Sequence, residues 1–336
     1  MSARAPAHWS RRGAGAILLL PLSLVFMLLA ALRRALYRAG VLRAQRLPVP
    51  VIVVGNIAVG GSGKTPVVAW LAESLREAGF HPGIVSRGYG GSVEAVAVLA
   101  PEGDAARFGD EPVLLTRLTG CPLAVGRDRP AAGQALLAAH PDVDVLISDD
   151  GLQHYALARD IEIVVVDEQV MGNRWRLPAG PLREGVARLA EVDLVIAHGA
   201  LSAALRAATG AVPVVSMHLE GGMLERIDGS ERRPLADFAG QRVHAVAGIG
   251  RPQRFFEQLA AAGLVVIGHA FPDHHPYAPE DLHFEDAAPK VLTAKDAVKC
   301  AAFAPADTWV LPVRASIDAT ASQRIVEKLT HGIPPA

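Results

Sequence analysis

The sequence predicts an α/β fold: a doubly wound, mostly parallel sheet, preceded by an N-terminal membrane helix and followed by a smaller second α/β domain. Three observations predict it. An apolar run at 51–54 enters a glycine-rich turn and then a segment with helical apolar spacing. Short apolar runs alternate with such segments over the rest of 47–212, and most are apolar on both faces, as strands covered by helices must be. Nineteen uncharged residues, 14–32, stand before this pattern.

The turn at 55–65, GNIAVGGSGKT, has the composition of a phosphate-binding P-loop. Its glycines let backbone N–H groups close around phosphate oxygens, and the dipole of the following helix favours the same anion. Lys64 adds a charge that reaches the β- and γ-phosphates, and the Thr65 hydroxyl is a ligand for Mg²⁺. The strict pattern has glycine where this chain has Ala58. The turn predicts a P-loop NTPase-like domain that binds ATP through Gly60, Gly61, Ser62, Gly63, Lys64 and Thr65.

A second, acidic element supports this interpretation. Residues 143–150 read VDVLISDD, an apolar strand that ends in Asp149 and Asp150. P-loop enzymes place an acidic group at the end of a neighbouring parallel strand, where it holds Mg²⁺ directly or through water. Acidic pairs after strands also cap helices and turns. Together with Lys64 and Thr65, the pair predicts a metal site made of Thr65, Asp149 and Asp150.

Length, charge and cysteine content narrow the class of protein. The chain has 336 residues and a mass of 35.3 kDa, enough for two domains that each bury a core. A formal net charge of −1 provides no basic field for nucleic acid. Cys121 and Cys300 lie far apart without zinc-ligand spacing, which argues against both a disulfide framework and a structural zinc site.

The uncharged segment 14–32 is long enough to cross a bilayer, since at ~1.5 Å per residue it covers roughly 28 Å. A cleaved signal peptide would carry the chain away from ATP, and a core helix would show a polar face, which this segment lacks. We therefore expect a membrane anchor. Five arginines follow it between residues 33 and 46, against three before it, which favours a cytoplasmic position for the rest of the chain. These arginines either contact anionic headgroups or only set the orientation.

The composition divides the chain into four parts: an anchor and basic flank (1–46), a P-loop domain (47–212), a linker (213–230) and a smaller α/β domain (231–336). Strands are expected at 51–54, 83–86, 95–99, 123–125, 145–148, 161–166 and 194–197, and in the smaller domain near 243–247, 264–267 and 309–311. Residues 214–228 alternate apolar and polar around Gly221 and Gly222, which predicts a hairpin within the linker.

Polar loop residues supply the remaining candidates. Asp110, in a loop that reads RFGDEP, either acts on substrate or caps the helix that follows. His274 lies in PDHHPY at 272–277, where a catalytic or substrate-orienting role competes with a plain surface loop. Four further side chains are candidates for contacts to phosphate or substrate, or for ordinary salt bridges: Arg87, Glu111, Arg129 and Glu184.

Together these segments resemble one family, the tetraacyldisaccharide 4′-kinases, which phosphorylate a lipid A precursor in Gram-negative bacteria. The resemblance covers nearly the whole chain. It rests on seven motifs: GNIAVGGSGKTP (55–66), SRGYGG (86–91), GDEP (109–112), DDGLQH (149–154), ARDIEIVVVD (158–167), LPAGPLRE (177–184) and FPDHH (271–275). Ala58 agrees with the GGxGKTP form that the loop takes in this family.

The resemblance implies transfer of the ATP γ-phosphate to the 4′-hydroxyl of a tetraacylated glucosamine disaccharide 1-phosphate, with Mg²⁺. It implies that Asp110 and His274 act together at that hydroxyl; physically, Asp110 would accept the proton while His274 orients Asp110 or tunes it electrostatically. Lys64 completes the implied catalytic set. The implied partners are the lipid substrate and the membrane surface, with neither nucleic acid nor an obligate protein partner. The implied location is the cytoplasmic side of the inner membrane of a Gram-negative bacterium.

A membrane-anchored P-loop ATPase switch is the main alternative. It would hydrolyse ATP without a lipid acceptor, so acceptor dependence separates the two functions. A ligase-like enzyme that acts on a soluble acid would leave the anchor unexplained. An adaptor with a vestigial loop would have no need of Lys64, Thr65, Asp149 and Asp150.

Overall fold

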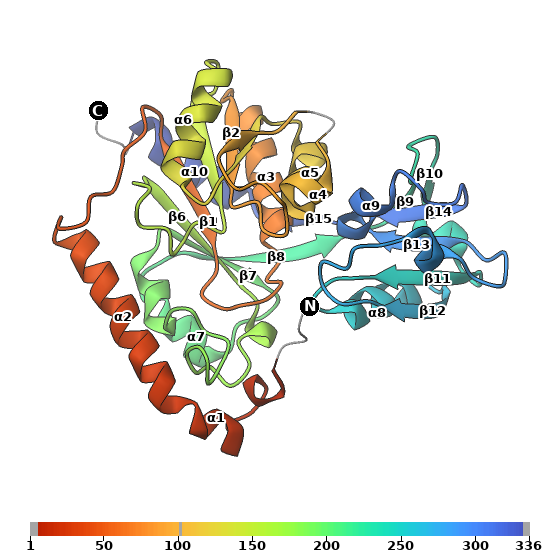
Figure 1. The fold of residues 1–336 in the computed structure, drawn as a ribbon, viewed down its shortest axis with the longest axis horizontal. Helices are drawn as coiled ribbons and strands as arrows, with labels where there is room; N and C mark the ends of the chain where they lie inside the picture. Colours follow the sequence, from red (N-terminus) through yellow and green to blue (C-terminus); the bar gives the residue numbers. More distant parts are fainter. Residues whose placement is uncertain (1–5, 101–102, 332–336) are drawn as a thin grey trace.

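The computed structural model describes residues 6–100 and 103–331, which form two β-sheets with helices packed against them (Figure 1). The larger sheet has nine strands in the order β15-β8-β7-β6-β1-β5-β2-β4-β3. The smaller has six strands in the order β10-β9-β14-β13-β11-β12. We call the two sheets with their helices the nine-stranded half and the six-stranded half.

The strands of the nine-stranded half are β1 (Val51–Gly55), β2 (Pro82–Ser86), β3 (Ala97–Val98), β4 (Leu123–Val125), β5 (Val145–Asp149), β6 (Ile161–Val166), β7 (Leu194–His198), β8 (Val214–Glu220) and β15 (Arg314–Ile317). Its helices are α3 (Lys64–Glu77), α4 (Ala105–Phe108), α5 (Asp110–Thr119), α6 (Arg129–Ala139), α7 (Ala203–Ala208) and α10 (Ala319–His331). The six-stranded half has β9 (Met223–Arg226), β10 (Arg232–Pro234), β11 (Arg242–Ala247), β12 (Val265–Ala270), β13 (Lys290–Thr293) and β14 (Thr308–Leu311), with α8 (Pro252–Ala261) and α9 (Ala294–Cys300).

The centre of the larger sheet is parallel and buried on both faces. β1 lies between β5 and β6 and runs parallel to both. Alternate side chains of β1 enter two cores: Ile52 and Val54 pack with α3, whereas Val51 and Val53 join the cluster on the opposite face. The predicted doubly wound sheet is confirmed. Because β1 and β5 end at the same edge, the glycine-rich turn and the acidic pair become neighbours.

The predicted hairpin at 214–228 is wrong. β8 pairs with β7 and β15 in the larger sheet, whereas β9 pairs with β10 and β14 in the smaller one. Gly221 and Gly222 therefore lie where the chain crosses from one half to the other. Two strands in different sheets alternate in polarity just as the two arms of a hairpin do, so the pattern did not distinguish them.

The chain crosses back before its end. β15 pairs antiparallel with β8, and α10 packs near α3, so residues 314–331 lie with the nine-stranded half, although they belong to the 231–336 region that was expected to form a separate domain. The strand expected at 95–99 is reduced to β3, which is an antiparallel edge strand. β13, between β11 and β14 in the smaller sheet, was not predicted.

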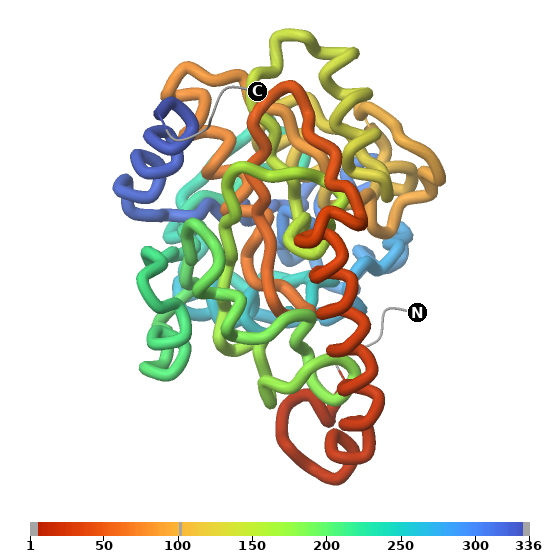
Figure 2. The backbone as a smooth tube through the Cα atoms, turned by 90° about the vertical axis from the view of Figure 1, so that its left-hand side faces the viewer, coloured from red at the N-terminus to blue at the C-terminus, as the bar shows by residue number. Residues whose placement is uncertain are grey.

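The N-terminal helices α1 (Ala14–Leu18) and α2 (Leu20–Arg38) run along the outside of the nine-stranded half (Figures 1 and 2). α2 is long and apolar enough to cross a membrane, and most of its side chains are exposed. Ser23 is buried, and its hydroxyl donates to Arg176 O and accepts from Ala179 N, each at 3.0 Å.

Both flanks of this helical segment contact the nine-stranded half. Before α1, Trp9 Nε1 donates to Pro178 O at 2.9 Å. Near the other end, Arg34 and Arg38 both bind the Glu191 carboxylate. The two flanks of the apolar stretch are therefore attached to one folded body.

Candidate active site

The turn between β1 and α3 has the backbone of an anion site. Gly63 is the N-cap of α3, and its φ of 87° is a left-handed value that favours glycine. Lys64 and Thr65 then form the first helical turn, whose N–H groups have no partners within the helix. Asn56 ties the turn together, since its Nδ2 donates to Ser62 Oγ at 3.1 Å. The predicted P-loop thus has the strand, loop and helix that phosphate binding requires.

The two predicted carboxylates lie beside this loop. Lys64 Nζ is 3.6 Å from Asp150 Oδ1, and Arg183 Nη1 is 3.0 Å from Asp150 Oδ2. Asp149, the last residue of β5, is buried and accepts a hydrogen bond from Ser86 Oγ at 3.0 Å. Asp150 has a φ of 48°, a rarely populated conformation that clusters at functional sites. The structure therefore brings together the lysine and both carboxylates.

The surroundings push the pKa values of these two carboxylates apart. Burial, together with the charges of Glu111 and Asp150, raises the pKa of Asp149 to about 6. Burial acts on Asp150 as well, but the charges of Lys64 and Arg183 outweigh it and lower its pKa to about 2. Asp150 has its cationic partners within the protein, whereas the charge of Asp149 is poorly compensated. Another cation near Asp149 would be stabilised.

Asp110 and His274 come from different halves and meet at the same cleft. Asp110 is the first residue of α5 and Gly109 is its N-cap, so Asp110 does not have the capping role considered above. His274 lies in the loop after β12, and its Nδ1 is 3.0 Å from both Asp110 Oδ1 and Oδ2. The Asp110 side chain is 4% exposed and the imidazole 23%. The imidazole is therefore the member of the pair that reaches the cleft.

Close backbone packing holds this pair in place. Gly109 has a φ of 93°, and a Cβ at this position would lie 2.5 Å from Tyr89 O. The Tyr89 ring packs against the His274 ring with 5.2 Å between centroids. Only glycine allows the SRGYGG and GDEP segments to approach so closely. Three of the sequence motifs thus converge around one imidazole.

Three of the four further candidates line the same cleft in different ways. Arg87 is exposed at its edge. Arg129 is 3% exposed, and its Nη1 donates to Asp149 O at 2.5 Å, so it supports the end of β5. Glu111 Oε1 accepts from Lys295 Nζ of the six-stranded half at 3.0 Å.

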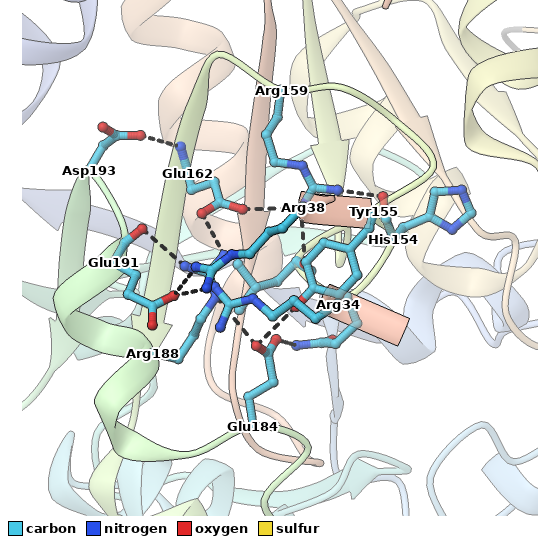
Figure 3. A network of polar contacts seen from close by, with 12 residues as sticks. Arg34, Arg38, His154, Tyr155, Arg159, Glu162, Glu184, Arg188, Glu191 and Asp193 are labelled. Atoms are coloured by element: carbon cyan, nitrogen blue, oxygen red, sulfur yellow. Dashed lines mark hydrogen bonds and ion pairs between the residues drawn. The ribbon is translucent and has the colours of Figure 1, made fainter. Parts of the chain in front are cut away.

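Glu184 belongs to a polar network that reaches the N-terminal helix (Figure 3). Its Oε1 accepts from Gln153 Nε2 at 2.8 Å and its Oε2 from Tyr155 Oη at 3.1 Å. Arg188 Nε lies 3.3 Å from Glu184 Oε2, and Arg188 Nη1 donates to the carbonyl of Glu191, the residue that binds α2. Contacts therefore run without a break from the basic flank of α2 to the loop that follows β5.

Sequence reasoning missed several members of the site. Asn56 and Gln153 stand within the motifs GNIAVGGSGKTP and DDGLQH, so a signal was present but was not assigned to them. Lys295 had no signal of this kind. It lies in AKDAVKC, a segment with the composition of an ordinary surface helix.

One cleft of about 2200 Å³ joins these groups. Its lining includes the loop residues Gly60, Gly61, Ser62, Gly63, Lys64 and Thr65, the polar residues Asp149, Asp150 and His274, and the α2 residues Phe26, Met27, Leu29 and Ala30. A phosphate-binding loop, an aspartate–histidine pair and an apolar helix therefore share one surface.

Comparison with known proteins gives the same picture over the full length. A family model described as LpxK, tetraacyldisaccharide-1-P 4′-kinase, matches residues 15–330. The tetraacyldisaccharide 4′-kinase of Aromatoleum aromaticum is 63% identical over 336 residues, which are 100% of both chains. That of Azoarcus sp. is 61% identical over 332 residues, 99% of this chain and 97% of the relative. A crystal structure of LpxK from Aquifex aeolicus in complex with ATP has a TM-score of 0.78 at 28% identity and covers 93% of this chain and 98% of that one. The chain belongs to the tetraacyldisaccharide 4′-kinase family.

Proposed function

We propose that this protein transfers the γ-phosphoryl group of ATP to the 4′-hydroxyl of a tetraacylated glucosamine disaccharide 1-phosphate, a step of lipid A biosynthesis. The observation that carries the proposal is the meeting of the phosphate-binding loop and the Asp110–His274 pair on one cleft, which α2 also lines. The structure of the Aquifex aeolicus relative in complex with ATP supports ATP as the donor.

The residues beside the loop fit Mg²⁺. Thr65, Asp149 and Asp150 offer the oxygen donors that Mg²⁺ prefers, and the poorly compensated charge of Asp149 favours a cation there. Within 6–100 and 103–331 no group of three or more His, Cys, Asp or Glu side chains is arranged to enclose a metal ion. This matches an ion held by one or two carboxylates together with nucleotide phosphates. Bound there, Mg²⁺ would neutralise charge on the β- and γ-phosphates.

Lys64 provides the protein's own positive charge at the phosphates. Its Nζ is held near Asp150 at 3.6 Å, at the N-terminus of α3. From this position it would contact the transferred group and stabilise the charge that develops on its oxygens. The ion pair with Asp150 positions the Lys64 ammonium at the cleft, and Asp150 is itself paired with Arg183.

The geometry favours His274, in place of Asp110, as the group that accepts the hydroxyl proton. The Asp110 carboxylate is buried and directs both oxygens to Nδ1, so Nδ1 carries a proton and Nε2 carries the lone pair. Nε2 would take the proton as the hydroxyl oxygen attacks the γ-phosphorus and ADP leaves. The hydrogen bond with Asp110 raises the pKa of His274 above its ordinary value and so strengthens it as a base. Asp110 then orients the ring and balances its charge.

We further propose that α2 lies in the membrane surface and does not cross the bilayer. A spanning helix has its flanks on opposite sides, but Trp9 and Arg34 both contact the nine-stranded half. Ser23 docks one side of the helix on that half, which leaves the exposed leucines of the other sides for lipid. In this arrangement the cleft would lie at the height of lipid headgroups, on the cytoplasmic side of the inner membrane where ATP is available.

Cysteine labelling tests this placement. Ser10→Cys and Arg43→Cys introduce exposed thiols on the two flanks, while Cys121 and Cys300 are buried. In sealed vesicles of defined orientation, an impermeant maleimide should label both positions from the cytoplasmic face. Labelling of the two positions from opposite faces would show that α2 spans the bilayer.

Acceptor dependence tests the reaction. Purified protein with γ-labelled ATP and Mg²⁺ should transfer label to the disaccharide lipid in detergent micelles or vesicles, and should release little phosphate without it. An ATPase switch would release phosphate equally well with no lipid present, and that result would overturn the proposal. A disaccharide lipid that already carries a 4′-phosphate is the matched control acceptor.

A further inference from the structure

Lys295 lies at the contact between the two halves. Its Nζ is 3.0 Å from Glu111 Oε1 of α5 and 3.1 Å from Asp273 Oδ1 of the loop after β12. It is also 3.4 Å from His274 Nε2, and its side chain is 15% exposed. An ammonium group thus faces the one imidazole nitrogen that Asp110 leaves free.

Neighbouring carboxylates keep this ammonium in position and charged. Burial disfavours a charged lysine, but Glu111, Asp110 and Asp273 outweigh it and raise the pKa of Lys295 above its ordinary value. Lys295 is therefore a permanent positive charge beside His274. A salt bridge that only joined the halves would need Glu111 alone, and would not need to approach His274 Nε2.

We infer that Lys295 is a positioning residue for the phosphoryl-transfer reaction: its ammonium disfavours a proton on His274 Nε2 and so keeps the base free for the acceptor hydroxyl. The inference rests on the proposed function. Asp110 and Lys295 then have opposite effects on the proton affinity of His274: Asp110 increases it, and Lys295 decreases it. The hydroxyl approaches the same nitrogen and would take the place of the ammonium there.

The charges that face the ring come from α5, α9 and the loop of His274, while the 86–91 segment packs the Tyr89 phenol ring against it. Asp110 and Glu111 come from α5, Asp273 from the loop of His274 itself, and Lys295 and Lys299 from α9; Asp296 of α9 is paired with Lys299 at 3.1 Å. The hydrogen bond and charge of Asp110 and the charge of Asp273 raise the pKa of His274, whereas burial and the charge of Lys295 lower it. Lys299 is 3.8 Å from Asp110 Oδ2 and acts on the carboxylate more directly than on the ring.

The test is the pH dependence of kcat in Lys295→Met. Removing the positive charge raises the proton affinity of His274, so the acid limb of the profile should move to higher pH by about one unit. At one pH unit below the wild-type limb, kcat of Lys295→Met should be roughly tenfold lower than that of wild type. Well above the limb, kcat of the variant should approach the wild-type value. Lys295→Arg retains the charge and should retain the limb. Asp273→Asn removes a negative charge and should move the limb to lower pH.

Lys290→Met is the matched control. Lys290 is also a buried lysine of the six-stranded half, paired with Asp307 at 2.7 Å, away from the dyad. It should lower thermal stability and leave the limb unmoved. A limb that moves equally in Lys290→Met, or that stays at the wild-type pH in both Lys295→Met and Asp273→Asn, would overturn the inference.

A second readout does not depend on turnover. Imidazole resonances of histidine-labelled protein, with His274 assigned from His274→Gln, should titrate at higher pH in Lys295→Met than in wild type. An unchanged titration would refute the inference even if the variant were inactive. If wild-type protein does not phosphorylate the lipid at all, the proposed function fails, whereas a normal wild-type profile with an unmoved variant limb rejects the role of Lys295 alone.

Discussion

The two ends of the cleft are assembled in different ways. At the phosphate end, Lys64, Asp149 and Asp150 come from neighbouring elements of the same sheet, because β1 and β5 are adjacent parallel strands. At the acceptor end, Asp110 and His274 are 164 residues apart in the chain and belong to different halves. The first end needs only the nine-stranded half to fold, whereas the second needs the two halves to meet.

This difference suits the order of events in a kinase. The contacts to a nucleotide would come from the loop, whereas the proposed base, His274, is positioned by the contact of the six-stranded half with α5. We therefore expect ATP binding and acceptor chemistry to respond differently to substitutions at this contact. The following variants probe this separation between ATP binding and acceptor chemistry.

The largest effect is expected at the phosphate end. Lys64→Ala removes the charge that faces the transferred group, and phosphoryl transfer should fall by roughly 10³-fold or more. ATP affinity, measured by calorimetry, should fall with it, because the same lysine contacts the nucleotide in the ground state. Circular dichroism should show an unchanged fold. Near-normal turnover in the folded variant would disprove the role of the loop.

At the acceptor end, only the chemistry should suffer. His274→Gln should lower kcat by ~10²–10³-fold with little change in ATP affinity, since the ring is part of the acceptor site. Asp110→Asn should lower it less, because the ring remains but loses its orientation and charge balance. The double variant should resemble His274→Gln alone. Multiplicative losses would show that the two side chains act separately.

Sequence alone predicted the phosphate end far better than the acceptor end. The glycine-rich loop and the acidic pair are each recognised from a short stretch of sequence. Because adjacent parallel strands end at the same edge of a sheet, the two are expected to lie together. Asp110 and His274 were linked only through the family resemblance, and Lys295 was missed. It lies 184 residues from Glu111, and nothing in its own segment marks the contact. The prediction that Asp110 takes the proton gave way to a proposal for His274 because burial and ring orientation are tertiary properties.

The same limit applies to the fold. Apolar runs identified the central strands of the larger sheet, because a strand that is buried on both faces consists of an unbroken run of apolar residues. The crossing at Gly221 and Gly222 was interpreted as a hairpin, and the return of β15 to the larger sheet was not foreseen. Partner choice among half-exposed strands depends on contacts between distant segments, which polarity patterns do not encode.

A second contact between the halves should have an intermediate effect. Arg254 Nη1 is 3.2 Å from Asp167 Oδ2, and its Nη2 is 2.7 Å from His198 Nε2, which is buried beside the loop at Gly63. Arg254→Met should lower kcat by roughly tenfold, because the six-stranded half is held less firmly. Arg242→Met, which removes an exposed arginine of the same half, is the control. If ATP affinity falls as much as kcat, the phosphate end is not independent of the second half.

The smallest effect is expected where α2 meets the nine-stranded half. Glu191 accepts Arg34 and Arg38 at a partly exposed site, and such pairs contribute about 1 kcal/mol or less to stability. Glu191→Gln should leave kcat and ATP affinity within about twofold and raise the KM for vesicle-embedded lipid by about the same factor, because the helix is less firmly positioned at the membrane. In detergent micelles, where the helix need not match a flat surface, even that change should disappear. A large loss of kcat would instead mean that the polar network through Arg188 and Glu184 transmits the position of α2 to the phosphate end, and the separation between the two ends would not hold.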